Sequence, residues 1–175
     1  MESGILVKVP YSQDPPRYEC RLRGLTAGQL VTHVQQRGRV MNWTLEVVVV
    51  PVSDVDRAKA FYANQLGFNV DHDTVVSDEV RVVQLTPPGS GCSIVVAKGL
   101  GNAMAPGSLK GLQLVVNDIH KARTQLLEHG VEVSEVTKLG KNPVPGGHEL
   151  DNVGFVYFSD PDRNEWAVQQ ISSRP

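Results

Sequence analysis

Residues 50–68, VPVSDVDRAKAFYANQLGF, decide the fold of this chain. The apolar run over 45–52, in which Glu46 is the one charged member, leads into this stretch and predicts a strand that is apolar on both faces. Asp54 follows as a helix N-cap, because its carboxylate can accept the free N–H groups of the first turn. Gly67 ends the helix, at a position where a left-handed residue is favoured. The apolar stripe of this helix comprises Val55, Ala58, Phe61, Tyr62 and Leu66.

The same unit returns in the second half of the chain. An apolar strand is expected over 112–116, and Asp118, 64 positions after Asp54 (118 − 54), is the second N-cap. Gly130 ends this second helix, which is one residue shorter than the first. The N-cap and the apolar helix positions of the two units match when the sequence is shifted by one constant number of residues, and each helix ends at a glycine. This match indicates an internal duplication. We therefore predict an α+β fold of two βαβββ modules. The second stripe comprises Ile119, Ala122 and Leu126.

The remaining strands follow from short apolar or alternating runs that turn residues separate. A polar stretch over 72–78 is expected to lie outside the strands, and the Gly/Pro-rich segment 139–152 is long enough to act as a lid over a site. The further strands are expected from Phe68 onward and over 79–86, 92–97, 131–136, 155–158 and 166–171.

Composition excludes two classes of partner. The 175 residues carry a net charge of −2 with scattered Lys and Arg, whereas a nucleic-acid footprint needs a basic patch. No apolar run approaches the roughly 20 residues of a membrane span, and the first residues lack the pattern of a secretory signal. Cys20 and Cys92 lie far apart and match no metal-binding spacing, which favours reduced thiols. We expect a cytoplasmic protein that binds neither nucleic acid nor membranes.

Residues 1–40 differ from the rest of the chain, because their apolar content is thin, arginines are frequent and prolines interrupt the first candidate strand. We interpret them as an N-terminal extension of uncertain order, followed by one domain over 41–175. Within that domain we place module one at about 43–98, a linker over 99–110 and module two at about 111–171.

Two stretches resemble one family. Residues 50–68 and 155–170, the latter containing Asp-Pro-Asp-Arg-Asn, closely resemble the glyoxalase, bleomycin-resistance and extradiol-dioxygenase superfamily, also called vicinal oxygen chelate proteins. The resemblance covers about 43–171 and implies a homodimer whose curled mixed sheets form a cup for small molecules. It leaves the reaction open, because members include lyases, isomerases, dioxygenases, thiol transferases and drug-sequestering proteins. Arg163 replaces the usual glycine of the turn, which costs on the order of 1 kcal/mol if φ is positive there.

The resemblance also implies where a metal would bind. Enzymes of the family place four His, Glu or Gln ligands on the cup face, at positions that correspond here to Val47, Val95, Gly111 and Ala167. None of these side chains can donate to a metal ion, so we expect no metal and no cofactor. The run Asp71-His72-Asp73 is not a substitute, because consecutive strand residues point to opposite faces.

Face alternation identifies the residues that should line the cup. Val49 shares a face with Val47, Gln113 with Gly111, and Glu165 and Gln169 with Ala167, while Trp166 and Val168 belong to the core. Gln113 and Gln169 are either polar contacts for a ligand or partners that satisfy one another. The expected ligand-binding residues are Val47, Val49, Val95, Gln113, Ala167, Gln169 and His148.

Two classes of function remain open. The first is a metal-free cup that binds an apolar or aromatic small molecule, as drug- or metabolite-sequestering members do. The alternative is a metal-independent lyase or isomerase in which His148 or Glu165 is the general base. A metal-dependent lyase or dioxygenase would need ligands at other positions. Cys92 is not a nucleophile candidate, because no basic residue nearby would lower its pKa.

Overall fold

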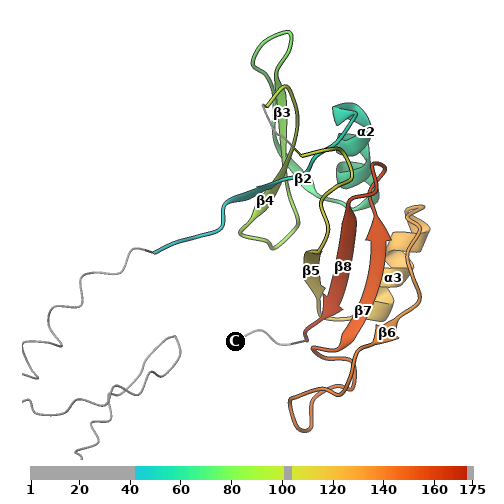
Figure 1. Ribbon diagram of the computed structural model, residues 1–175. Helices are drawn as coiled ribbons and strands as arrows, with labels where there is room; N and C mark the ends of the chain where they lie inside the picture. The colour runs from blue at the N-terminus through green and yellow to red at the C-terminus, as the bar shows by residue number, and fades with distance from the viewer. Residues whose placement is uncertain (1–41, 101–103, 173–175) are drawn as a thin grey trace, which may run out of the picture. The chain divides into compact units, whose positions relative to one another are not determined.

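The computed structural model describes residues 42–100 and 104–172, shown as a ribbon in Figure 1. The described residues from Thr44 onward belong to one compact unit. The extension predicted for 1–40, with Cys20, lies outside the described residues.

Module one is a four-stranded mixed sheet with one helical segment. The strand order is β1-β4-β3-β2, in which β1 runs parallel to β4 and the other pairs are antiparallel. Its elements are β1 (Val47–Val49), α2 (Val55–Ala60), the π-helix η1 (Phe61–Gln65), β2 (Asn69–Val75), β3 (Arg81–Thr86) and β4 (Ser93–Lys98).

Module two repeats this arrangement. Its strand order is β5-β8-β7-β6, again with the first and last strands parallel. The predicted α+β fold with two βαβββ modules is therefore confirmed, and the two sheets are open, as a cup requires. The elements are β5 (Leu112–Val116), α3 (Ile119–Glu128), β6 (Thr137–Lys138), β7 (Gly154–Ser159) and β8 (Glu165–Gln170).

Both helices begin and end where the sequence predicts. Asp54 Oδ1 accepts a hydrogen bond from the Arg57 backbone N–H at 3.0 Å. Asp118 Oδ1 accepts from the N–H groups of Lys121 and His120, at 3.0 and 3.1 Å, and these bonds, that of Lys121 above all, lower the pKa of the Asp118 carboxyl. The two stops, Gly67 and Gly130, have positive φ values of 71° and 76°.

The first helix differs from the second in its last turn. Between Phe61 and Gln65 the backbone adopts π-helical geometry, and the Leu66 N–H bonds the Phe61 carbonyl at 3.1 Å. A π-turn accommodates one extra residue, which accounts for the one-residue difference in helix length. It also lets the adjacent side chains of Phe61 and Tyr62 both be buried.

Two strand predictions are wrong in extent. The expected strand over 131–136 forms only a single bridge, from Val133 to Phe158, because the Ser134 side chain and the Arg123 guanidinium take backbone bonds there. The stretch 72–78, expected to lie outside the strands, contains the end of β2, which continues to Val75 along β3.

The helix-facing sides of the two sheets share one core. Phe61 packs against Phe158 with ring centroids 6.3 Å apart, and Tyr62 against Trp166 at 5.8 Å. Trp166 and Val168 are each 3% exposed, as predicted. Figure 1 shows α2 and α3 on the same side of the sheets. Side chains at the alternate strand positions therefore face away from this core, on what we call the open face of each module.

A buried polar group joins the modules inside this core. The Tyr62 hydroxyl donates to Asp160 Oδ2 at 2.8 Å and accepts from the Trp166 indole N–H at 3.2 Å. Asn164, fully buried, donates to the same carboxylate oxygen at 2.7 Å. Burial, together with the Asp160 charge, raises the pKa of Tyr62 far above its ordinary value, so this hydroxyl stays a donor.

Candidate functional site

The open face of module two is defined by strand register. Gln113 lies opposite Ala167, Ala167 opposite Tyr157, and Gln169 opposite Phe155. Because residues directly opposite one another share a face, these five side chains belong to one surface. The face alternation expected for Gln113, Ala167 and Gln169 is thus present in the structure.

The two glutamines contact one another. Gln113 Nε2 donates to Gln169 Oε1 at 2.6 Å, and Gln169 Nε2 donates to the Asn152 carbonyl at 2.7 Å. Gln113 is exposed and Gln169 half-buried. Among the described residues the Gln113 Oε1 oxygen has no hydrogen-bond partner, so an acceptor remains on the open face.

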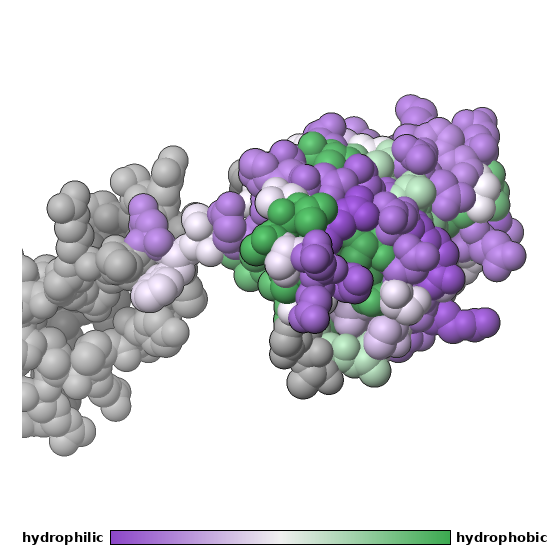
Figure 2. Space-filling model, turned by 90° about the horizontal axis from the view of Figure 1, so that it is seen from above, coloured by the Kyte–Doolittle hydropathy of each residue, from purple (hydrophilic) through white to green (hydrophobic). Residues whose placement is uncertain are grey.

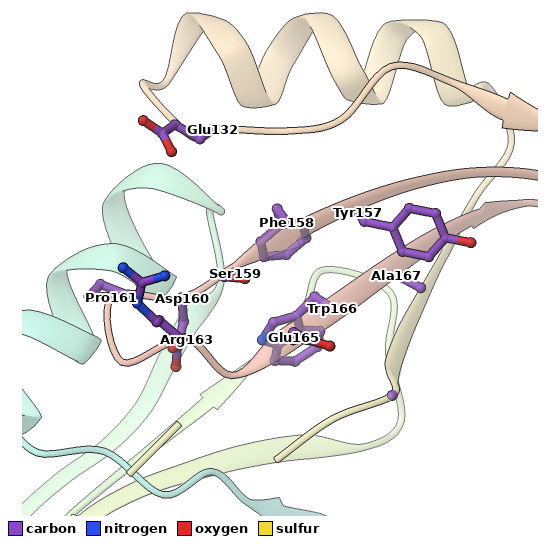
Figure 3. Close-up of a pocket in the computed structure, with 11 residues that line it drawn as sticks. Glu132, Tyr157, Phe158, Ser159, Asp160, Pro161, Arg163, Glu165, Trp166 and Ala167 are labelled. Atoms are coloured by element: carbon purple, nitrogen blue, oxygen red, sulfur yellow. The ribbon is translucent and has the colours of Figure 1, made fainter. Parts of the chain in front are cut away.

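A cavity of about 670 Å³ lies at the end of module two where β7 turns into β8, and its lining includes residues of the open face and of the helix-facing side (Figure 3). This volume is within the range of small-molecule sites. Glu132, which follows α3, lies across the cavity from the Asp160–Arg163 turn. The other lining residues are Gly111, Tyr157, Phe158, Ser159, Glu165, Trp166 and Ala167.

An aromatic pair extends from this cavity along β7. The rings of Phe155 and Tyr157 are stacked, with centroids 6.2 Å apart and planes 9° apart, and Tyr157 is 41% exposed. Such a surface suits a planar apolar ring. The sequence alone did not single out either residue. Their two-residue spacing in the hairpin partner of 166–171 was the available signal, because it placed them on one face.

Hydrogen bonds to Asp160 and from Lys110 fix the conformation of the turn at the cavity edge. Asp160 Oδ1 accepts from the backbone N–H groups of Asn164 and Asp162, at 2.8 and 2.9 Å. Arg163 has a φ of 73°, so the position that usually holds glycine keeps its left-handed backbone. Lys110 Nζ donates to the Arg163 carbonyl at 2.7 Å. The Arg163 side chain lines the cavity.

The two candidate bases lie at opposite ends of β8. Glu165, at the start of the strand, lines the cavity and pairs with Lys110 at 2.9 Å. His148 lies beside Gln170 at the other end, where its Nδ1 is 2.9 Å from Gln170 Nε2 and 3.2 Å from the Leu150 backbone N–H. Five residues of strand separate the two ends by about 16 Å. The structure therefore does not bring His148 and Glu165 together.

The segment 139–152 does not cover the cavity, since none of its residues lines it. The lid prediction is wrong for this cavity because the segment is bonded to the far end of β8. Asp151 Oδ1 accepts from the Ser172 hydroxyl at 2.5 Å and from Gln170 Nε2 at 3.0 Å, and these bonds lower the pKa of Asp151. Asn142 donates to the His148 carbonyl at 2.8 Å.

The open face of module one carries Val47 and Val49, opposite Ser93 and Val95 in the parallel β1–β4 pair. Val95 is 7% exposed and Val47 37%. This face also holds a group of polar side chains that the sequence alone did not reveal: Asp71, Gln84, Thr86 and Ser93.

The side chains present do not fit a metal ion of the kind that the resemblance implies. Val47, Val95, Gly111 and Ala167 offer no donor atoms. In residues 42–100 and 104–172, no group of three or more His, Cys, Asp or Glu residues is arranged to hold one.

The comparisons agree with this fold. Residues 44–168 match the model of the Glyoxalase/Bleomycin resistance protein/Dioxygenase superfamily, and the chain belongs to that superfamily. A search of curated proteins found no match. Over the part of the chain that the structure describes, no helix is long and apolar enough to cross a membrane.

Three solved structures illustrate the similarity. TnmS3, an antibiotic binding protein from Streptomyces sp. CB03234, is 32% identical, with 77% of this chain and 100% of that chain covered and a TM-score of 0.59. A glyoxalase/bleomycin resistance protein from the same organism is 33% identical, with 73% and 100% covered and a TM-score of 0.56. A superfamily member from Sphaerobacter thermophilus is 27% identical, with 75% and 99% covered and a TM-score of 0.60.

Proposed function

We propose that this protein binds an apolar or aromatic small molecule in its cup without a metal, and so sequesters a drug or metabolite. The observation that carries the proposal is the cavity of about 670 Å³ beside the stacked, partly exposed rings of Tyr157 and Phe155. A planar ring laid on Tyr157 would be bordered by Ala167, with the free Gln113 acceptor on the same face. An apolar wall with a few polar groups is typical of small-molecule sites.

The similarity to TnmS3 supports this class of function. That protein is an antibiotic binding protein, and all of its length aligns with this chain. Binding at such a site needs neither a metal nor a general base.

Catalysis has weaker support from the same geometry. Glu165 lines the cavity, but the Lys110 ammonium pairs with it. The Nδ1 atom of His148 already lies within hydrogen-bond distance of Leu150 and Gln170, about 16 Å along the strand. We therefore favour binding over the lyase or isomerase alternative.

A second copy of the chain would complete the cup. The described residues that line the cavity all belong to module two. A ligand in it would therefore be covered on one side only, unless a second surface faces the cavity. In the described residues, β1 and β5 each pair with one strand only, and Leu45 and Val47 beside that edge are 69% and 37% exposed. Figure 2 shows apolar side chains on the surface of this unit among polar ones. We propose a homodimer in which the open face of module one in one copy faces the cavity in the other.

Three measurements test the proposal. Elemental analysis should find no stoichiometric metal, and a chelator should leave stability unchanged. Naphthalene derivatives titrated by calorimetry should bind the wild type, and Tyr157→Ala should weaken them about tenfold by removing the stacking surface. Light scattering should give a dimer, and Val47→Lys should shift it toward monomer.

Clear results would contradict each part. A chelatable, stoichiometric metal whose removal lowers stability would overturn the metal-free reading. Equal affinities of Tyr157→Ala and the wild type for the probes would show that the binding site does not include Tyr157. A monomer at micromolar concentration would contradict the proposed homodimer. Glu165→Gln, which keeps the size of the side chain, is the matched control on the cavity rim and should leave affinity for neutral probes unchanged.

A further inference from the structure

The polar group on the open face of module one occupies an otherwise aliphatic surface. Gln84 lies opposite Val95 and Ser93 opposite Val47, so both share the face of the valines. Ser93 is only 7% exposed, although its hydroxyl is polar. Asp71 and Thr86 complete the group, which we call the Asp71 cluster.

A β-bulge turns Asp71 onto this face. In the β2–β3 ladder, Val70 lies opposite Leu85 and His72 opposite Gln84, so Asp71 is the extra residue. The next acidic residue, Asp73, lies opposite the core residue Val83. The sequence-based expectation of simple alternation through this run is therefore wrong at the bulge. Bulges commonly redirect side chains next to functional sites.

The hydrogen bonds of the cluster run in one direction. Thr86 Oγ1 donates to Asp71 Oδ2 at 2.5 Å, so in its 2.6 Å contact with Ser93 it accepts the serine proton. Ser93 Oγ in turn accepts from Gln84 Nε2 at 3.2 Å. Every proton in this chain thus points toward the carboxylate. The atoms left free among the described residues, Asp71 Oδ1 and Gln84 Oε1, are both acceptors.

Asp71 also keeps an unbalanced charge. Its neighbour Asp73 pairs with Arg81 at 2.9 Å and with Lys59 at 2.7 Å, and these bonds, that of Arg81 first, lower the pKa of Asp73. Asp71, by contrast, has no Lys, Arg or His partner in the described part of the chain. A carboxylate oriented by hydroxyl groups and without a counter-ion attracts a cationic donor.

We infer that the Asp71 cluster is a subsite that selects ligands with a protonated amine attached to their aromatic part. The inference rests on the proposed function, since it names which small molecules the cup prefers. In the proposed homodimer this face lies opposite the cavity of the other copy. The Gln84 carbonyl and the Asp71 carboxylate would then accept from the ammonium, while Val47, Val49 and Val95 would contact the face of the apolar part that is turned away from the cavity.

Three probes of matched shape test this inference: naphthylmethylammonium, naphthalenemethanol and methylnaphthalene. Calorimetry on the full chain should show that the ammonium binds about tenfold tighter than methylnaphthalene, with the alcohol in between. Asp71→Asn should bring the three affinities to within about twofold while leaving that of methylnaphthalene unchanged. Asp78→Asn makes the same charge change in the exposed β2–β3 turn and should keep the preference.

The outcomes separate this inference from the proposed function. Equal binding of all three probes by the wild type overturns the amine subsite and leaves the proposed function standing. Binding of none overturns both. A preference that survives Asp71→Asn also overturns the subsite. If that variant does not fold, the NMR chemical shifts of the Asp71 and Thr86 backbone amides are followed in the wild type. Naphthylmethylammonium should change them and methylnaphthalene should not; the opposite result would overturn the subsite.

Discussion

The two modules share a backbone plan but present different chemistry on their open faces. Both sheets have the order first-last-third-second within the module, and both helices are capped by aspartate. Module one offers valines and an acceptor-rich carboxylate cluster, whereas module two offers stacked aromatic rings and a glutamine pair. Because the core uses only the helix-facing side chains, the open faces can change without loss of the fold. The repeat thus defines the scaffold, whereas the alternate strand positions set the chemistry of each open face.

The largest expected effect comes from the core that joins the modules. Trp166→Ala removes a side chain that is 3% exposed and packs on Tyr62, Phe68 and Phe158. We expect the free energy of unfolding to fall by about 3–5 kcal/mol, in a single transition seen equally in both modules. Tyr157→Ala, on the open face of the neighbouring strand, should cost less than about 1 kcal/mol. Two separate transitions would show that the modules fold independently.

The hydrogen-bonded pair of Gln113 and Gln169 marks one difference between the two open faces. Gln169→Leu leaves the Asn152 carbonyl and the Gln113 amide without a partner, so stability should fall by about 1–2 kcal/mol. Gln113→Leu removes an exposed donor and should cost under about 0.5 kcal/mol. Chemical denaturation of both single variants and the double variant measures their coupling. A double variant more stable than either single one would show that the pair is structural and would remove it from the ligand site.

The turn of module two holds Arg163 in a left-handed backbone conformation. Arg163→Gly should raise the free energy of unfolding by about 1 kcal/mol, because glycine adopts the φ of 73° without steric cost. The denaturation midpoint measures the gain, and Arg163→Ala, which keeps the Cβ, is the matched control and should show none of it. An equal gain in the alanine variant would assign the effect to the side chain rather than to the backbone.

The smallest effect is a pH dependence at the second helix cap. The pKa of Asp118 is lower in the folded state, so its contribution to stability is present above the unfolded pKa of about 4 and is lost as pH falls below it. Asp118→Asn should therefore be less stable than the wild type near neutral pH, and the gap should close in acid. Thermal melts over this pH range measure the difference in stability between the wild type and the variant. A difference that grows as the pH falls would contradict a lowered pKa of Asp118 in the folded state.

Local patterns in the sequence were enough for the caps, the helix stripes and the glycine stops. Asp54, Asp118, Gly67 and Gly130 act within one helical turn of their own position, so their partners are known from spacing alone. The burial of Trp166 likewise followed from period-two alternation. With these features the plan of two modules could be predicted, and so could the face of Gln113 and Gln169.

The remaining features depend on residues far apart in the chain, and only the tertiary structure decided them. The bulge at Asp71 exists only against β3, and the stacked pair of Phe155 and Tyr157 matters because β8 places Ala167 opposite Tyr157. Segment 139–152 is bonded to the end of β8 through Asp151, away from the cavity. Each outcome is a choice of cross-strand partner, and such choices are made by packing and register rather than by the local preferences that a sequence displays.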